Sequence, residues 1–391
     1  MSTPTAARLL RQRWALGVVA LVFLAAKALT AWWTTGTDDA LFYGIFAGTV
    51  RRVGPVSIYS QHLIVRFNHP PPVGWLLVGL NHLTDLGLPF RFLLRLPACL
   101  ADVGSAFLVF ELLRRRARPA TAFAGAVVVA ANPVLFVVSG FHGNTDPVFV
   151  FFVLLSVWLL VDRDRPVGAG LAIAAALGVK LVPVVVLPAL CAAAWRRHRA
   201  VPFGAATGAA VALCWLPATL REYPAMRANV FGYAGQVQDY GMVMLLRRSG
   251  AAHLVDTYVG GRYVVVAAAA LPAALWAWRR AEDLPAAVGL ALVSFLALSP
   301  AFAPQYLAWP VAAGVLLAPV LAGVYSAVAG VLLLVLYTEW SHGLPWDWAH
   351  SRPATSVDRL LRLLVWLVLV GWSALGVRGL LMAVRRRALQ P

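Results

Sequence analysis

Long apolar runs rich in Leu, Ala and Val alternate with short polar clusters along the 391 residues of the chain. These runs are too long and too uniform for the alternating segments of about ten residues that build membrane β-barrels. In lipid, every backbone N–H and C=O must be satisfied within its own segment, which favours helices. The pattern predicts an all-α polytopic membrane protein. We expect a single membrane domain over residues 1–391, with about 12 transmembrane or half-embedded helices.

Composition agrees with this class and fixes an orientation. Hydrophobic residues make up 61% of the chain and charged residues 13%, against about 25% charged in soluble domains. The net charge of +17 would suit nucleic acid, but the arginines occur in short clusters between apolar runs, as in cytoplasmic loops. We therefore expect no nucleic-acid partner, a multi-pass protein of a bacterial plasma membrane, and cytoplasmic N- and C-termini. The clusters are Arg8–Arg13, Arg114–Arg118, Arg163–Arg165, Arg196–Arg199, Arg279–Arg280 and Arg385–Arg387.

With these clusters in the cytoplasm, the remaining polar stretches form three long outer loops that carry short interfacial helices. The stretch Pro70–Pro89 is expected to lie half-embedded, because a full span would move Arg114–Arg118 outside. The segment Val167–Trp195 starts and ends at basic clusters, so we expect two short helices broken near Pro183 and Pro188. The outer loops cover residues 34–90, 220–261 and 337–358.

Two adjacent carboxylates, Asp38 and Asp39, follow the first apolar run. An Asp at this place is ordinary helix-capping chemistry, because its carboxylate accepts a backbone N–H. Capping needs only one of the pair, so the other is equally a candidate general base for an acceptor hydroxyl that attacks a sugar C1. A divalent ion held by both carboxylates also stays open. The sequence shows no metal motif, and we expect no cofactor.

The second candidate is the motif SGFHGNTDP, in which His142, Asn144 and Asp146 fall within five residues. Asn and Asp at a helix start cap backbone N–H groups. The same three side chains are equally suited to clamp a sugar or a phosphate.

Lys180 lies near the middle of the broken segment, where an unpaired ammonium costs several kcal/mol. A structural lysine would extend to a helix end, and this one is poorly placed to reach the cytoplasm. It therefore needs an anion, and a lipid-linked phosphate at the outer leaflet would serve.

Two further outer stretches carry polar groups among aromatic residues. Gln305 and Tyr306 lie in SPAFAPQYLAWP, and His342 and His350 lie in TEWSHGLPWDWAH. Both stretches also suit the aromatic belt at a membrane interface. The histidines are candidates to donate to a phosphate.

Taken in order, these pieces resemble the GT-C superfamily of membrane glycosyltransferases. They are most similar to the bacterial polyprenol-phosphate-mannose-dependent mannosyltransferases and to the mannosyltransferase of glycosylphosphatidylinositol synthesis. Each piece is short, and the likeness rests on their order and their common side. The pieces are Asp39–Tyr43, Gly54–Tyr59, Pro70–Pro71, His142–Asp146, Gly178–Pro183, Phe231–Gly241 and Pro304–Trp309. Where the family has Tyr-Pro-Pro, this chain has His69-Pro70-Pro71.

The resemblance implies a GT-C-like fold and roles for the matching residues. Asp39, rather than Asp38, would be the catalytic base, and Lys180 would hold the donor phosphate with His342 as a helper. The remaining implied residues would bind substrate. They are Asp38, Tyr43, His69, His142, Asn144, Asp146, Gln305 and Tyr306.

The resemblance predicts an inverting glycosyltransferase that moves a sugar, with mannose the best guess, from a polyprenyl-phosphate donor. The acceptor would be a lipid or glycan on the outer face, and membrane lipids would be the other partners. Two alternatives remain at this stage: a secondary transporter or flippase that binds a phosphorylated or lipid-linked substrate through Lys180, and a membrane acyltransferase with His142 as base. A transporter should offer polar residues on both sides, whereas here the cytoplasmic face offers mainly arginine.

Overall fold

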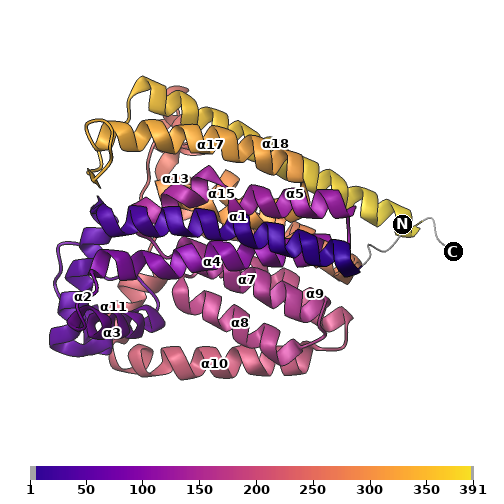
Figure 1. Ribbon diagram of the computed structural model, residues 1–391, viewed down its shortest axis with the longest axis horizontal. Coiled ribbons are helices and arrows are strands. Elements are labelled where there is room, and N and C mark those ends of the chain that lie inside the picture. The colour runs from indigo at the N-terminus through magenta and orange to yellow at the C-terminus, as the bar shows by residue number, and fades with distance from the viewer. Residues whose placement is uncertain (1–5, 389–391) are drawn as a thin grey trace.

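The computed structural model describes residues 6–388, with side chains as far as residue 382. Within that range the structure is mainly helical, and its two strands, β1 (Gly36–Thr37) and β2 (Trp348–Ala349), are two residues long and pair in parallel. Most long helices run along one axis of the molecule (Figure 1). The prediction of an all-α membrane protein is confirmed in its class.

The predicted count of about 12 segments is not confirmed. Seven helical segments of the described chain are long and apolar enough to cross a membrane, or eight if a pair bent by 64° counts as one span. The seven are α1 (Ala6–Trp33), α4 (Phe90–Leu113), Pro119–His142, α10 (Ala200–Arg221), Ala281–Leu298, α17 (Pro319–Trp340) and the part Ser356–Met382 of α18 (Ser356–Ala388). The segment Pro119–His142 comprises α5 (Pro119–Ala130), α6 (Pro133–Val137) and η2 (Val138–His142), and Ala281–Leu298 comprises η6 (Ala281–Asp283) and α15 (Leu284–Leu298).

The other helices are shorter or less apolar, and many have proline in the first helical turn, where its fixed φ is suited. The apolar ones are α7 (Asp146–Val161), α8 (Pro166–Val179), η3 (Val182–Val186), α9 (Leu187–Arg196) and α16 (Trp309–Leu317). The bent pair comprises η5 (Ala252–Leu254) with α13 (Val255–Gly260), and α14 (Arg262–Arg279). The remainder are α2 (Asp38–Ser57), η1 (Ile58–Ser60), α3 (Pro71–Asp85), α11 (Tyr223–Met226), η4 (Arg227–Phe231), α12 (Gly241–Arg248) and η7 (Pro304–Ala308).

The predicted break in the segment Val167–Trp195 is confirmed. Helix α8 ends at Val179, Lys180 has an extended backbone, and a 3₁₀ turn with Pro183 at its start leads into α9. Proline disfavours a helical conformation in the residue before it and removes a backbone donor, so a continuous helix is interrupted here. The break places the Lys180 side chain inside the molecule rather than along a helix surface.

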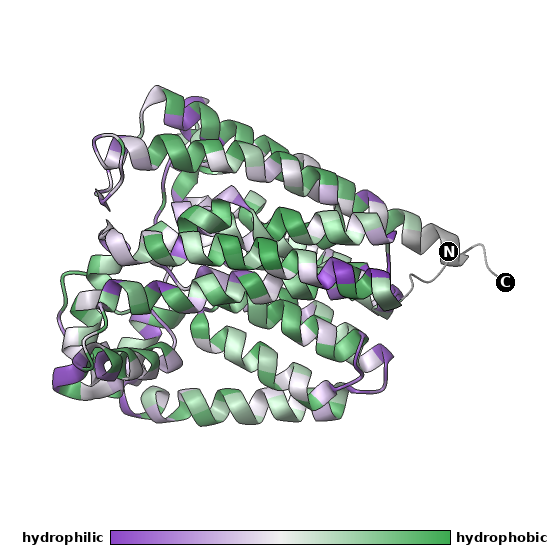
Figure 2. Ribbon diagram, in the orientation of Figure 1, coloured by the Kyte–Doolittle hydropathy of each residue, from purple (hydrophilic) through white to green (hydrophobic). Residues whose placement is uncertain are grey.

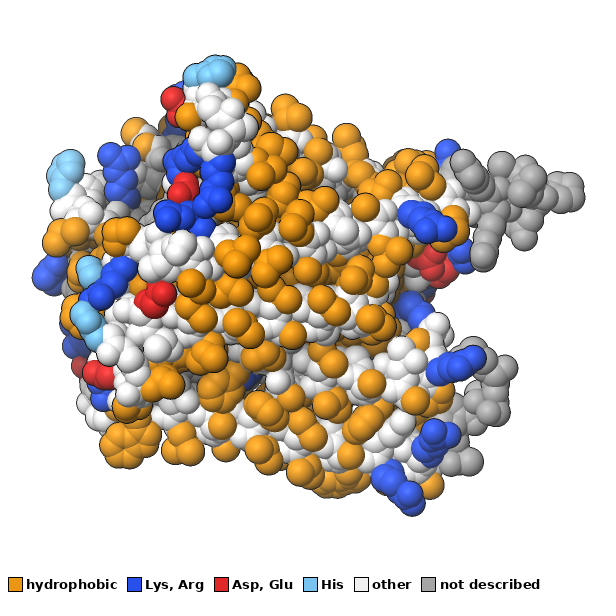
Figure 3. Space-filling model, turned by 90° about the horizontal axis from the view of Figure 1, so that it is seen from above, with side chains coloured by type: hydrophobic (Ala, Val, Ile, Leu, Met, Phe, Trp, Pro, Cys, Tyr) orange, Lys and Arg blue, Asp and Glu red, His pale blue; other side chains and the backbone are white. Residues whose placement is uncertain are grey.

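Polar residues gather at the two ends of the long axis, with an apolar belt between them (Figures 2 and 3). At one end, arginines from separate loops meet acidic residues: Arg116 contacts Asp162 at 2.7 Å and Arg199 contacts Asp164 at 2.6 Å. The other end carries α2, α3 and α11 (Figure 1). We call this second end the α2 end.

At the α2 end, a buried apolar cluster holds α2 and α3 against the start of α4 and the end of α10. Its members include Tyr43, Phe46, Tyr59, Leu77 and Trp215. This cluster is separate from the main core, which fills the space between the long helices. It gives the first turn of α2 a rigid support.

Candidate active site

Asp38 and Asp39 begin α2, directly after β1. The pairing of β1 with β2 brings the chain around residue 350 beside them, although it is distant in sequence. The Asp38 carboxylate binds this segment, because Oδ1 lies 3.0 Å from His350 Nδ1 and Oδ2 accepts the Ser351 N–H at 3.1 Å. Asp38 therefore ties the loop to the start of α2.

The Asp39 carboxylate has different partners and is held through one oxygen. Its Oδ2 accepts from Asn144 Nδ2 at 2.7 Å, His142 Nε2 at 3.1 Å and Gln305 Nε2 at 3.2 Å. No hydrogen bond among the described residues involves Oδ1, and the side chain is 31% exposed. One oxygen is thus fixed by three donors while the other is available to a substrate. We call Asp39, His142, Asn144 and Gln305 the Asp39 cluster.

His142 is buried at the end of the π-helical turn η2. The Tyr337 hydroxyl contacts its Nδ1. A hydroxyl that donates to Nδ1 leaves the ring proton on Nε2, facing Asp39, which is the tautomer that a carboxylate partner requires. Tyr337 is not predictable from the sequence, because it is one aromatic residue among several at the end of an apolar helix.

The pKa of Asp39 reflects opposing influences. Burial raises it, but the hydrogen bond and electrostatic attraction of His142, the hydrogen bond from Asn144 and the charge of Lys180 outweigh burial and lower it from 3.8 to about 2. Asp39 is therefore ionised throughout the physiological range. This shift contributes stability above pH 3.8, and that contribution is lost as pH falls through about 2.

Replacing His142 should show how far this histidine lowers the pKa of Asp39. In His142→Ala the pKa of Asp39 should rise, because the carboxylate loses a hydrogen bond and burial still opposes its charge. The acidic limb of the kcat/KM profile should move to higher pH, whereas the wild-type profile should show no limb from Asp39 above about pH 3. Rates measured from pH 3.5 to 8 test this. An unchanged acidic limb in the variant would contradict the link between His142 and Asp39.

Lys180 has an anionic partner within the chain. Its Nζ lies 2.6 Å from Asp146 Oδ1, which also accepts Trp309 Nε1–H at 2.7 Å. The ammonium is 5.0 Å from the centre of the Tyr306 ring, a cation–π distance. Asp146 is fully buried and its Oδ2 has no hydrogen-bond partner among the described residues, whereas the Lys180 side chain is 20% exposed. Asp146 supplies the anion that the sequence analysis could not assign, and part of the Lys180 side chain stays exposed.

Tyr43 and His69 lie beside the Asp39 cluster. The Tyr43 hydroxyl is 3.4 Å from both His69 Nδ1 and Thr145 Oγ1. Burial and the charge of Lys180 lower the pKa of His69 from 6.5 to about 3, so this histidine is neutral. Its ring then has one donor and one acceptor for hydroxyl groups.

His342 lies apart from these residues. It is exposed, and its Nδ1 is 3.2 Å from the Arg352 guanidinium. No hydrogen bond within the described part of the chain joins it to the Asp39 cluster or to Lys180. The geometry therefore gives no support to a role for His342 beside Lys180.

The site offers little for a metal ion. No group of three or more His, Cys, Asp or Glu side chains within residues 6–388 is arranged to hold one. Asp38 and Asp39, which the sequence leaves open as joint ligands, have separate partners.

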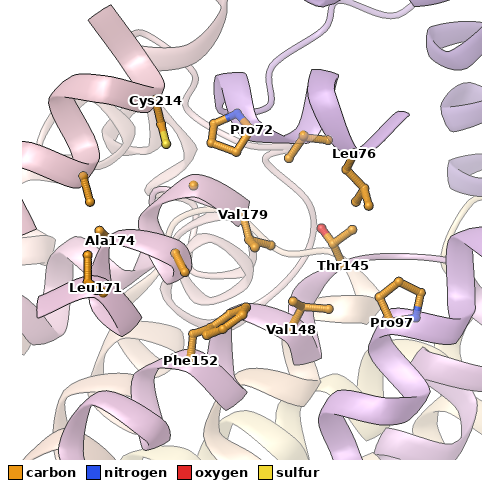
Figure 4. Close-up of a pocket in the computed structure, with 14 residues that line it drawn as sticks. Pro72, Leu76, Pro97, Thr145, Val148, Phe152, Leu171, Ala174, Val179 and Cys214 are labelled. Carbon is orange, nitrogen blue, oxygen red and sulfur yellow. The ribbon is translucent and has the colours of Figure 1, made fainter. Parts of the chain in front are cut away.

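An apolar cavity of 430 Å³ opens between α3, α4, α7, α8 and α10. Figure 4 shows Pro72, Leu76, Phe152, Leu171 and Val179 around it, with Thr145 at its edge. Thr145 precedes Asp146 and Val179 precedes Lys180, so one side of the cavity adjoins the Lys180–Asp146 pair. Of the 14 lining residues, only Thr145 and Cys214 carry an oxygen or sulfur atom in the side chain. We call this space the apolar cavity.

The sequence profile of glycosyltransferase family 87 matches residues 67–300, more than half of the 391 residues. The chain belongs to glycosyltransferase family 87. This is a GT-C-type family of membrane glycosyltransferases, so the protein is a membrane-embedded transferase. No curated protein matches the chain.

The matched range bears on the site and on the alternatives. It includes His142, Asn144, Asp146 and Lys180, while Asp39 precedes it and Gln305 follows it. In this glycosyltransferase, Asp39 accepts hydrogen bonds from His142 and Asn144 of the matched range and from Gln305 beyond it. Membership of a glycosyltransferase family favours neither the transporter nor the acyltransferase alternative.

Proposed function

We propose that this glycosyltransferase moves a sugar, mannose in the first instance, from a polyprenyl-phosphate donor to a hydroxyl of a lipid or glycan acceptor. The observation that carries the proposal is the Asp39 carboxylate, with one oxygen fixed by three donors and the other free. The pKa shift of Asp39 includes a contribution from Lys180. A base and a cation therefore act within one site.

In the proposed step, the acceptor oxygen attacks C1 of the sugar as Asp39 Oδ1 takes its proton. The bond from C1 to the phosphate oxygen breaks, and polyprenyl phosphate leaves with the electron pair. Attack opposite the leaving group inverts the anomeric centre. A carboxylate with a pKa of about 2 is a weak base, which suits a transition state in which the hydroxyl becomes acidic only as it bonds to C1.

We propose a polyprenyl-phosphate donor because a positive charge and an apolar surface lie in the same part of the protein. Lys180 would bind the phosphate through the N–H groups that Asp146 does not use, and charge-assisted bonds of this kind are the stronger ones. The apolar cavity beside it would take the isoprenoid chain, since apolar surface there loses contact with water. Tyr43, His69, Asn144 and Tyr306 would surround the sugar and the acceptor hydroxyl.

The native cysteines offer a test of the donor's position. Cys214 lines the apolar cavity and Cys191 does not, and both are exposed, whereas Cys99 is buried. Polyprenyl phosphate should slow alkylation of Cys214 by N-ethylmaleimide at least fivefold, because the chain would cover the thiol, and should leave Cys191 unaffected. Mass spectrometry of both sites gives the two rates. Equal rates at Cys214 with and without the lipid would refute this location.

Orientation is proposed from the arginine loops. Those loops lie opposite the α2 end, so the positive-inside rule places the Asp39 cluster on the outer face of a bacterial plasma membrane, with both termini cytoplasmic. The acceptor would then be a lipid or glycan of the cell envelope.

The activity is tested with purified protein in vesicles. Radiolabelled polyprenyl-phosphate mannose is supplied with membrane-extract lipids, and lipid products are separated by chromatography. Transfer of label with release of polyprenyl phosphate is expected. Absence of product with mannose, glucose and arabinose donors on polyprenyl phosphate, in a preparation that is folded, would refute the donor class.

A further inference from the structure

Arg95 is a fully buried guanidinium in α4, with an exposed fraction of 0%. Its Nη1 donates to Ala31 O at 3.2 Å, Thr34 O at 3.1 Å and Thr34 Oγ1 at 3.1 Å, and its Nη2 contacts Thr35 O. These oxygens belong to the last turn of α1 and the residues after it. The charge therefore lies at the negative end of the α1 dipole. It fixes the point where the chain leaves the helix toward Asp39.

The guanidinium also lies between two glycines with positive φ, Gly36 (φ 96°) and Gly143 (φ 88°). A Cβ on Gly36 would collide with Arg95 Nη2 and would lie 2.7 Å from Phe141 O. A Cβ on Gly143 would lie 3.3 Å from Arg95 Nε. One glycine precedes Asp38 and Asp39, and the other follows His142.

Arg95 thus lies beside two of the segments that form the Asp39 cluster, the one before Asp38 and the one after His142. A second connection joins the same segments, because Thr37 Oγ1 donates to His142 O at 2.7 Å. The first turn of α2 also packs on the other segment, since a Cβ on Gly143 would be 3.0 Å from Ala40 Cβ. Asp39 and His142 are 103 residues apart in sequence, and Arg95, on a third element, donates to the chain before Asp38 and lies close to Gly143 after His142.

We infer that Arg95 is a positioning residue that sets the distance between Asp39 and the His142 segment. It acts through the backbone of residues 34–36 and does not touch substrate. The inference rests on the proposed role of Asp39 as base. Arginine suits this role because its planar fork reaches several carbonyl oxygens at once, whereas lysine is a single point charge.

The test compares Arg95→Met and Arg95→Lys with Arg91→Met, a matched control. Arg91 lies one helical turn before Arg95 on α4 and is exposed. In Arg95→Met, kcat should fall about a hundredfold, since a displacement of about 1 Å at a reacting group has that effect. The donor KM should change less than threefold, because Lys180 lies on another element and α4 contributes one lining residue, Pro97, to the apolar cavity.

A merely structural role would not move the pH profile. In Arg95→Met the acidic limb of kcat should rise in pH, because Asp39 would lose part of the hydrogen bonding that keeps it ionised. Arg95→Lys should recover part of kcat and of the profile. Thr37→Val, which removes the second connection, should shift the same limb by a smaller amount.

The outcomes separate the two claims. If wild-type protein transfers no sugar, the proposed function fails. If wild type is active and Asp39→Asn is not, while folded Arg95→Met keeps wild-type kcat and pH profile, only the positioning role is overturned. If less of the Arg95→Met protein folds, but the folded fraction has the wild-type pH profile, the positioning role is also overturned. Arg95 then contributes to stability alone.

Discussion

Asp39→Asn should lower kcat about a thousandfold, because the enzyme would lose its general base. Asn keeps an oxygen where Asp39 Oδ2 accepts from His142, Asn144 and Gln305, so the fold and the cluster should persist. An NH₂ group then replaces Oδ1 and is unable to take the acceptor proton. Initial rates of sugar transfer at saturating donor measure the effect, and melting temperature in detergent should stay within a few degrees of wild type.

The adjacent carboxylate provides the control. Asp38→Asn removes the same charge one residue away, but Asp38 binds His350 and Ser351 in the loop. Its kcat should fall less than tenfold, because a loop contact is weakened and no proton acceptor is lost. If Asp39→Asn forms product as fast as wild type, Asp39 is not the base. If Asp38→Asn shows the larger loss, the two roles are reversed.

Sequence alone predicts the helical class and a break near Pro183, since apolar runs and prolines are local signals. It does not predict the number of spans. Helices such as α7, α8 and α16 are apolar but short, and a segment packed inside the protein need not reach across the bilayer. Counting apolar runs treats every such segment as a span.

Only part of the site can be predicted from the sequence, for a physical reason. Asp39, Asn144 and Lys180 are each conspicuous as a polar group beside apolar residues. Their mutual contacts depend on long-range packing: Gln305 reaches Asp39 across 266 residues, and Tyr337 reaches His142 across 195. No local sequence pattern predicts contacts between residues that are so far apart in the chain. Arg95 is missed for the same reason, because its partners are backbone carbonyls of another helix.

The Lys180–Asp146 pair shows how packing changes an interpretation. A lysine in an apolar segment indicates a missing anion, and the sequence motif that contains Asp146 indicates a helix cap or a ligand clamp. The structure joins them at 2.6 Å. A buried pair of this kind has a structural role of its own, so any test of donor binding has to separate the two roles.

Lys180→Met should raise the donor KM about a hundredfold, because the phosphate loses charge-assisted hydrogen bonds that contribute about 1.5–3 kcal/mol. It should also lower stability by about 3 kcal/mol, because buried Asp146 is left without its partner. Both effects are measured on one preparation, by kinetics with varied polyprenyl-phosphate mannose and by thermal unfolding in detergent.

The double variant Lys180→Met/Asp146→Asn separates them. A neutral Asn still accepts the Trp309 N–H that Asp146 Oδ1 accepts now, and no unpaired charge remains, so the melting temperature should recover most of its loss. The donor KM should stay high, because the phosphate still has no ammonium to bind. If the donor KM recovers together with stability, Lys180 serves only to neutralise Asp146, and the phosphate is bound elsewhere.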